Sequence, residues 1–271
     1  MLNKNLLLRT LTGSLFVAVV VLSIFVSSWM FEILFFFFTI IGAYELIKAS
    51  SQIQQLSINK WMAYVSVILV YGIIVISASQ NHYRYLFLLI LLLPVSMLVE
   101  LYRKKEYPFL NVAYTLLPAI YIALPLGLLN FFLPLGDGKL LLAFFITIWA
   151  GDTFAYMVGS LIGKHKLFER ISPKKSWEGT LGSMILTIGL SFFYPSLFGL
   201  LESWQWVVFV FIALVAGAYG DLVESLFKRS VFIKDSGSML PGHGGILDRF
   251  DAVILATPFI FVFLQIISTK F

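Results

Sequence analysis

Apolar runs of about 20 residues recur along almost the whole chain, and this feature restricts the fold more than any other. The 271 residues are 60% hydrophobic, with a mean hydropathy of +0.94, whereas soluble domains are usually about 45–50% apolar. A membrane-spanning helix needs about 20 mostly apolar residues, and a β-barrel would instead show alternating segments of about 10 residues. The runs do not alternate, so the sequence predicts an all-α polytopic membrane protein.

We expect nine spans, and the distribution of basic residues supports this number. If the N-terminus is cytoplasmic, the cytoplasmic segments hold 16 of the 19 lysines and arginines, and only Arg84, Lys139 and Lys270 lie outside. This bias is the one that the positive-inside rule requires. We therefore expect the N-terminus in the cytoplasm and the C-terminus outside, in the cell membrane. The expected spans are residues 10–28, 30–48, 61–79, 84–102, 111–133, 140–162, 179–200, 204–226 and 251–268.

The start of the first span and its border with the second span each allow two interpretations. Lys4 and Arg9 precede an apolar run, as in a signal peptide, but no clear small-residue cleavage site follows, so we interpret the run as a retained span. Only a short border near residue 29 separates it from the second span, so these two could form a helical hairpin.

Polar residues are distributed unevenly along the chain. Residues 1–140 resemble generic membrane helices, whereas residues 141–271 carry two polar loops, 163–178 and 227–250, both expected in the cytoplasm. We therefore divide the chain into an N-terminal membrane part and a second membrane region, where we expect any functional site. There is no cysteine, which excludes disulfides, thiolate metal sites and cysteine nucleophiles.

Acidic residues lie in or against the apolar runs of the second half. Asp152, Asp221 and Glu224 fall within spans, and Asp248 and Asp251 stand at the start of the last one. Intramembrane carboxylates are costly and usually functional. The structural alternatives are an ion pair or, for Asp248 and Asp251, a helix N-cap.

The spacing of these acids indicates a cation site. Asp221 and Glu224 are three residues apart, with Lys228 on the same helical face, and Asp248 and Asp251 repeat the three-residue spacing. Small neighbouring residues allow close helix contact, so the acidic faces could converge. Oxygen ligands without cysteine, and with three scattered histidines, favour a hard divalent cation such as Mg²⁺ or Mn²⁺.

Basic residues and glycines in the two loops complete a pattern typical of phosphate chemistry. The segment SPKKS, residues 172–176, predicts a turn that places two lysines and hydroxyls near the lipid headgroups, although other cations of that loop suit ordinary anionic-lipid contact. GHGG, residues 242–245, predicts either a phosphate-binding loop or an ordinary Pro–Gly turn. Carboxylates, cations and such a loop together suit phosphoryl or nucleotidyl transfer.

Three other classes of membrane protein are alternatives to such an enzyme. A transporter would spread its carboxylates across the membrane and often carry inverted repeats, and no repeat is visible. A CDP-alcohol phosphotransferase would carry the pattern D-G-x2-A-R…G-x3-D-x3-D, which this sequence lacks. A non-catalytic membrane scaffold would not need the segment GHGGILDRFD.

Residues 225–251 read S-L-F-K-R-x4-K-D-x-G-x2-L-P-x-H-G-G-I-x-D-R-F-D. This stretch resembles the motif of the phosphatidate cytidylyltransferase (CDP-diacylglycerol synthase) family, and WAGDTFAYMVGSLIGKHK and SPKKSWEG are similar to preceding segments of that family. The resemblance covers about residues 141–258. It implies that CTP and phosphatidic acid give CDP-diacylglycerol and pyrophosphate with Mg²⁺, with room for a second cation. It also implies a homodimer in contact with membrane lipid, and no nucleic-acid partner.

We transfer roles residue by residue. Asp221, Asp248 and Asp251 are expected to hold the metal, and Lys175 to act beside them in catalysis. Asp152 is either a further ligand or orients a basic residue, and Glu224 is a candidate partner of Lys228. The residues expected to bind substrate or phosphate are Ser172, Lys174, Lys175, Ser176, Lys228, Arg229, Lys234, His243, Gly244, Gly245 and Arg249.

Overall fold

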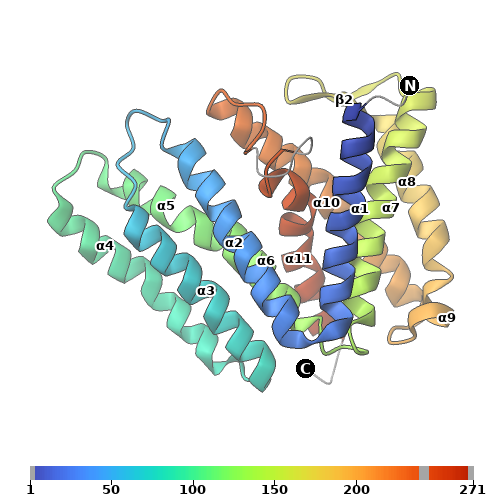
Figure 1. Cartoon of the computed structure of the whole chain (residues 1–271), viewed down its shortest axis with the longest axis horizontal. Helices are drawn as coiled ribbons and strands as arrows, with labels where there is room; N and C mark the ends of the chain where they lie inside the picture. The colour runs from blue at the N-terminus through green and yellow to red at the C-terminus, as the bar shows by residue number, and fades with distance from the viewer. Residues whose placement is uncertain (1–3, 238–243, 268–271) are drawn as a thin grey trace. The chain divides into compact units, whose positions relative to one another are not determined.

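The computed structural model describes residues 4–237 and 244–267, and nearly all of its secondary structure is helical (Figure 1). The predicted all-α class is confirmed apart from one short β-hairpin. The elements are α1 (Lys4–Val26), α2 (Ser28–Ser50), α3 (Lys60–Gln80), η1 (Tyr83–Leu91), α4 (Leu92–Arg103), α5 (Pro108–Pro118), η2 (Ala119–Ala123), α6 (Leu124–Leu128), η3 (Leu129–Phe131), α7 (Lys139–Ile162), β1 (Lys166–Phe168), β2 (Ser172–Ser176), α8 (Trp177–Ser191), α9 (Tyr194–Phe198), α10 (Ser203–Ser230) and α11 (Leu247–Ile267).

The chain forms two compact units. Unit 1 consists of Met1–Phe131 and Ser230–Phe250, and unit 2 consists of Phe132–Arg229 and Asp251–Phe271. The division at residue 140 that we expected rests on the distribution of polar residues rather than on contacts. By contacts, most of the second polar loop belongs with the N-terminal helices.

Seven helical segments in the described part of the chain are long and apolar enough to cross a membrane: Ser28–Ser50, Lys60–Gln80, Tyr83–Arg103, Pro108–Phe131, Lys139–Ile162, Ser203–Ser230 and Leu247–Ile267. The predicted spans 10–28 and 179–200 are not among them. In α1 the described apolar part, Leu11–Val26, is shorter than a full span. The predicted span 179–200 divides into α8, of 15 residues, and the short α9.

A proline explains the division between α8 and α9. At 1.5 Å per residue, α8 is about 22 Å long, less than the roughly 30 Å of a hydrocarbon core. Pro195 stands in the first turn of α9. In a continuous helix its ring would clash with the carbonyl group of Ser191, four residues earlier, and it has no N–H to donate to that carbonyl. The helix α8 ends at Ser191. Seven spanning segments are therefore found by length and hydropathy in the described residues, and nine remains a prediction.

Aromatic packing in unit 1 fixes the beginning of α11. The ring of Phe250 lies 5.6 Å from those of Phe16 and Phe35 and 5.2 Å from that of Phe38, measured between ring centroids. Phe16 belongs to α1 and the other two to α2, and the chain reverses direction between these helices near Ser27 (Figure 1). Such tilted and edge-to-face pairs stabilise a contact beyond simple burial. The first turn of α11 is thereby held against the N-terminal hairpin.

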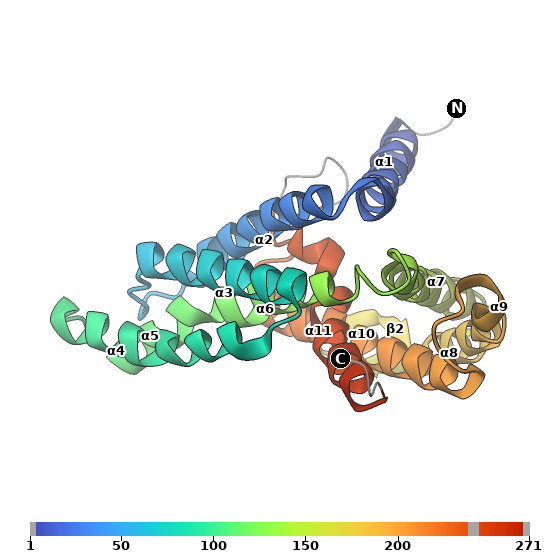
Figure 2. The same cartoon turned by 90° about the horizontal axis from the view of Figure 1, so that it is seen from below.

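In unit 2, α7 and α8 pack side by side and are joined at one end by the β1–β2 hairpin (Figures 1 and 2). The strands are antiparallel, with Lys166 opposite Ser176 and Phe168 opposite Ser172. The predicted SPKKS turn is thus wrong in its backbone conformation, because the segment forms strand β2. Strand β2 has only five residues and, apart from a proline, none of them is apolar. The alternation of apolar and polar residues that predicts a strand is therefore absent from its sequence.

Glycines allow the backbones of α7 and α8 to approach closely. A Cβ atom at Gly179 would lie 2.9 Å from the Ala155 carbonyl oxygen and 3.0 Å from the Gly159 Cα. Both are main-chain atoms of α7, which cannot move aside as a flexible side chain can. Small residues have this function in many membrane helix pairs.

We predict that Gly179→Ala lowers the free energy of unfolding by about 1–3 kcal/mol, because the added methyl group overfills the contact. Thermal unfolding of the detergent-purified protein would show this as a lower Tm. Gly189→Ala is the matched control, because a Cβ at Gly189 in the same helix meets nothing within 4 Å. Equal Tm values for the two variants would contradict the close backbone contact.

Candidate active site

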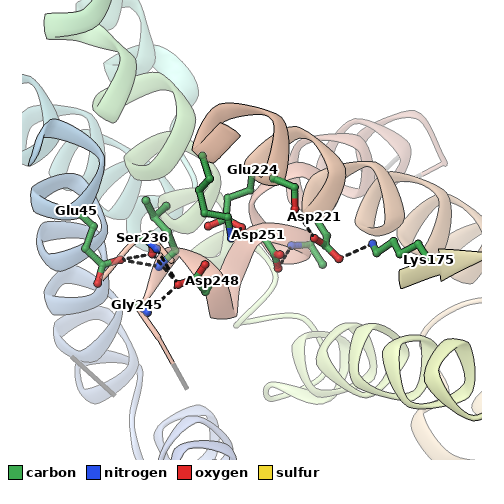
Figure 3. A network of polar contacts seen from close by, with 12 residues as sticks. Glu45, Lys175, Asp221, Glu224, Ser236, Gly245, Asp248 and Asp251 are labelled. Carbon is green, nitrogen blue, oxygen red and sulfur yellow. Dashed lines mark hydrogen bonds and ion pairs between the residues drawn. The ribbon is translucent and has the colours of Figure 1, made fainter. Parts of the chain in front are cut away.

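Two groups of polar side chains contain the three expected metal ligands and Lys175 (Figure 3). In unit 1, Glu45, Ser236, Gly245 and Asp248 gather at the start of α11, and we call them the cap cluster. In unit 2, a second group of acids and lysines lies along α10, and we call it the acid cluster. The acid cluster consists of Lys175, Asp221, Glu224, Lys228 and Asp251.

In the cap cluster, three donor groups lie within hydrogen-bond distance of one oxygen of Asp248. Its Oδ2 lies 2.8 Å from the Gly245 backbone nitrogen, 3.1 Å from the Ser236 backbone nitrogen and 3.0 Å from the Ser236 Oγ. Three donors on one oxygen fix the orientation of the carboxylate. Asp248 therefore ties the preceding loop to the first turn of α11, which is close to the capping alternative considered from the sequence.

Glu45 of α2 occupies the N-terminus of α11 from a distant part of the chain. Its Oε1 accepts from the Ile246 amide at 3.1 Å, and its Oε2 accepts from the Leu247 amide and the Ser236 hydroxyl, each at 3.0 Å. The Glu45 side chain is buried. A carboxylate is favourable at this place because the first amides of a helix have no intrahelical partner and carry the positive end of its dipole.

Glu45 and Ser236 are the residues of the cap cluster that the sequence did not predict. The signal was present, since Glu45 is an acid inside the apolar run TIIGAYELIK, and intramembrane acids are costly wherever they occur. The backbone partners of Glu45 lie 201 and 202 residues away, which no local pattern can indicate.

In this structure, two glycines of the predicted phosphate loop, Gly244 and Gly245, lie against the carboxylates of Asp248 and Glu45. Gly244 has a left-handed backbone, with φ +83°, and a Cβ there would lie 2.7 Å from the Asp248 Oδ2. A Cβ at Gly245 would collide with the Ser236 hydroxyl and the Glu45 carboxylate. The Gly245 N–H donates a hydrogen bond to Asp248. To bind phosphate, this N–H would first have to break that hydrogen bond. His243 lies outside the described residues.

In the acid cluster, Lys175 of strand β2 reaches α10. Its Nζ lies 2.5 Å from the Asp221 Oδ2 and 3.4 Å from the Ala218 carbonyl oxygen (Figure 3). The other carboxylate oxygen of Asp221 accepts from the Ser225 hydroxyl at 3.2 Å. The structure thus brings together two residues for which we predicted catalytic roles, although the sequence did not indicate that they pair.

The remaining acids of this cluster lie nearby. Glu224 is 1% exposed, and its Oε2 lies 2.7 Å from the Lys228 Nζ, so the expected pairing of these residues is present. Asp251 lies within electrostatic range of Asp221, Glu224 and Asp152, and its Oδ1 accepts from the Ala252 amide at 2.7 Å.

The predicted close approach of small residues is found where α10 passes the start of the unit 2 part of α11. A Cβ at Gly220 would collide with the Asp251 carbonyl oxygen and would lie 3.0 Å from the Ala252 Cα. Because the backbones meet here, the neighbouring acids Asp221 and Asp251 are brought into range of each other.

The carboxylate oxygens of these residues suit a hard cation, and the geometry limits how many of them can bind one ion. Within residues 4–237 and 244–267, no group of three or more histidine, aspartate or glutamate side chains is placed to hold a metal ion. Mg²⁺ usually takes one or two protein carboxylates together with phosphate and water oxygens. Two carboxylates in range of each other, as Asp221 and Asp251 are, fit that preference.

The predicted site residues outside the two clusters differ in their exposure to solvent. Ser176 instead is buried at the N-cap of α8, where its hydroxyl accepts from the Gly179 amide at 3.2 Å. Ser172 is half-buried. The exposed ones are Asp152, Lys174, Arg229, Lys234 and Arg249.

Glu178, in the first turn of α8, ties the β-hairpin to that helix. It accepts from the Lys164 and His165 amides at 3.1–3.2 Å, and its Oε1 lies 2.6 Å from the His165 Nδ1. Hydrogen bonding to its own backbone amide, the His165 ring and these loop amides lowers the pKa of Glu178 from 4.5 to about 2.

The fold and the two clusters define a multi-pass α-helical membrane protein with acidic residues set into its apolar helices. The sequence profile of the Cytidylyltransferase family matches residues 7–267. The chain therefore belongs to the cytidylyltransferase family, as the motif between Ser225 and Asp251 indicated.

Bacterial relatives support this assignment. A phosphatidate cytidylyltransferase of Staphylococcus haemolyticus (strain JCSC1435) is 40% identical over 166 residues, which cover 59% of this chain and 62% of the relative. One from Staphylococcus epidermidis (strain ATCC 12228 / FDA PCI 1200) is 37% identical over the same shares. One from Staphylococcus aureus (strain COL) is 33% identical over 224 residues, 80% of this chain and 85% of the relative. The match with the first two spans 62% of their length.

We predict that Glu178→Gln loosens the hairpin and speeds tryptic cleavage after Lys164 in membranes at pH 7, because the amide cannot replace the carboxylate as acceptor of several hydrogen bonds. Glu169→Gln, an exposed acid in the same hairpin, is the control and should leave the cleavage rate unchanged.

The direction of the pKa shift also fixes the pH dependence of this link. A lowered pKa in the folded state means that the carboxylate form stabilises the fold. The contribution of Glu178 is fully present above its ordinary pKa of 4.5 and is lost as the pH falls through about 2. Isotope-edited infrared titration of the Glu178 carboxyl checks this, and a midpoint at or above 4.5 would contradict it.

Proposed function

We propose that the protein transfers a cytidylyl group from CTP to phosphatidic acid, giving CDP-diacylglycerol and pyrophosphate. The observation that carries this proposal is the pairing of Lys175 with Asp221, in range of Asp251, within helices that are otherwise apolar. The names of the staphylococcal relatives support the same reaction. One substrate is dissolved in water and the other in the bilayer, so a polar cluster in membrane helices suits the chemistry.

The reaction needs little covalent chemistry from the protein. A phosphate oxygen of phosphatidic acid attacks the α-phosphorus of CTP, the bond from that phosphorus to the β-phosphate oxygen breaks, and pyrophosphate leaves. The attacking phosphate is already ionised near pH 7, so no strong general base is required. The main barrier is the repulsion between two polyanions, which fixed cations reduce.

The cations of this chain have two distinct roles in the proposal. Lys175 holds Asp221 in place and offers positive charge at the reacting phosphates. Lys174, Arg229 and Arg249 are exposed and would receive the phosphates of CTP, together with Ser172, Lys228, Lys234 and the GHGG loop.

Asp221, Asp251 and Asp248 would hold Mg²⁺. The bound ion would neutralise charge on the phosphates and orient them. Two acids in range of each other support this assignment, because a cation reduces their mutual repulsion. Asp152 is either a further ligand or orients a basic residue, and a second cation fits the family resemblance.

The membrane arrangement belongs to the same proposal. With α1 and the α8–α9 pair as two further crossings, the chain has nine spans, a cytoplasmic N-terminus and its two polar loops on the cytoplasmic side of the cell membrane. That orientation brings the site to the compartment that contains CTP. We also propose a homodimer.

Pyrophosphate release from CTP by the purified protein tests the function. Release should require both phosphatidic acid and Mg²⁺. No release with any lipid would sink the proposal and favour the transporter alternative, in which the same acids line an ion path.

We predict that Asp248→Asn abolishes this turnover while the protein still folds, because the amide loses the negative charge expected to hold the metal. Asp137→Asn is the control, since Asp137 has a left-handed backbone, with φ 54°, that asparagine also tolerates. Pyrophosphate release and Tm are measured for both. Full activity in Asp248→Asn would remove Asp248 from the proposed metal site.

We also predict that Lys175→Gln lowers kcat by about 100-fold, since a cation aimed at developing phosphate charge is usually worth about 10²–10³ in rate. The neighbouring exposed lysine provides the comparison, because Lys174→Gln should mainly raise the KM for CTP. Initial rates at varied CTP separate the two effects. Equal kcat values for the two variants would contradict the special role of Lys175.

A further inference from the structure

Glu45 lies in the N-terminal part of the chain, outside every motif that the family resemblance covers, yet it contacts the start of α11 directly (Figure 3). We infer that Glu45 is a positioning residue for Asp248, holding the loop and the first turn of α11 so that the Asp248 carboxylate keeps one orientation. The inference rests on the proposed function, in which Asp248 is a metal ligand.

The two acids are coupled through a single hydroxyl. The Ser236 Oγ lies 3.0 Å from the Glu45 Oε2 and 3.0 Å from the Asp248 Oδ2. A serine hydroxyl has one proton to donate, so it donates to one carboxylate at a time. The orientation of Ser236, and with it the hydrogen bonding of Asp248, therefore depends on Glu45.

Burial makes the contacts of Glu45 hard to replace. Glu45 is 4% exposed, and Ile246 and Leu247, whose amides it accepts, are 3% and 2% exposed. Without the Glu45 carboxylate these amides would lose an acceptor in a place that water reaches poorly, and a buried unsatisfied donor is costly. They would then compete with Gly245 and Ser236 for Asp248, which would change its orientation.

The glycines on both sides of the loop are shaped to the Glu45 carboxylate. A Cβ at Gly237 or at Gly245 would collide with it. Both glycines belong to the segment between α10 and α11. Because neither has a side chain, the Glu45 carboxylate can lie against the backbone at both positions. The loop is thereby matched to Glu45, and not only to Asp248.

A different role for Glu45 would be to occupy a phosphate site until CTP displaces it. The burial of Glu45 favours a permanent contact, because a displaceable group would have to be open to the nucleotide. The two roles predict opposite kinetics. Loss of a positioning residue lowers kcat, whereas loss of a competing carboxylate lowers the KM for CTP.

The test uses the full-length protein in detergent, with Glu45→Gln compared against Glu32→Gln. Glu32 is the other acid of α2 and is the matched control. Three quantities are measured: amide hydrogen exchange of residues 244–250 without ligand, Mn²⁺ affinity by paramagnetic resonance, and the kcat and KM for CTP.

For Glu45→Gln we expect faster exchange at the start of α11 and a loss of about 10–100-fold in Mn²⁺ affinity or kcat, as for partners that orient metal ligands. Glu32→Gln should match the wild type. Faster exchange with unchanged Mn²⁺ affinity and kcat would make Glu45 a structural cap and overturn the inference. A lower KM for CTP with unchanged kcat would also overturn it, in favour of the displaceable role.

Failure of the proposed function would be visible separately. If the wild type does not turn over CTP, the reaction is wrong, but Mn²⁺ affinity still decides whether Glu45 positions Asp248. If Glu45→Gln does not fold, Ser236→Ala removes the shared hydroxyl instead. It should weaken Mn²⁺ binding in the same direction, and unchanged Mn²⁺ affinity would overturn the inference.

Discussion

The compensation of acidic side chains inside apolar helices is the constraint on which the rest of the structure depends. A carboxylate removed from water is costly unless hydrogen bonds or an opposite charge replace the lost solvation. Glu45 receives two backbone amides, Asp221 receives Lys175, and Glu224 receives Lys228. Glu224 and Lys228 lie one turn apart on α10, but the other two compensations join distant segments, so Glu45 and Asp221 specify which segments must meet.

A similar network operates away from the candidate site. Glu100, buried in α4, lies 2.6 Å from Arg103 and accepts from the Asn111 amide group at 2.8 Å. The Asn111 carbonyl in turn accepts from the Ser57 amide at 2.8 Å. This network joins the loop before α3 to α4 and α5, which suits a purely structural role. Burial of an acid alone therefore does not identify a functional residue.

The candidate site differs because its compensated acids gather at helix ends and glycines. Gly244 and Gly245 allow two carboxylates to approach the start of α11, and Gly220 brings α10 near Asp251. These features place charge at the border between an apolar helix and a polar loop. A reaction that joins a soluble nucleotide to a membrane phosphate needs charge at that border.

Features with a short-range physical cause were predictable from the sequence. The apolar runs predicted the helical membrane fold, and the spacing of Glu224 and Lys228 predicted their pairing. The small residue Gly220 correctly indicated a close helix contact beside Asp221.

Features that depend on distant contacts were not predictable in this way. The pairing of Lys175 with Asp221 joins a strand to a helix 46 residues later, and Glu45 meets partners about 200 residues away. The division of the expected span 179–200 has a different origin. Its cause is local, because Pro195 interrupts the helix, but the segment is apolar throughout and hydropathy does not register the proline. Hydropathy reports where a chain is apolar, but it reports neither helix length nor the partner of a buried charge.

The fate of the α-phosphate of CTP tests the central claim most directly, which is that the acidic site in these membrane helices transfers a nucleotidyl group to a lipid phosphate. Purified protein is given phosphatidic acid and CTP labelled at either the α- or the γ-phosphate, and the label in the lipid extract is counted. We predict that α-label enters the lipid only when phosphatidic acid is present, and that γ-label stays in the water phase as pyrophosphate. Transfer of γ-label to lipid, or no lipid label from either position, would contradict the account.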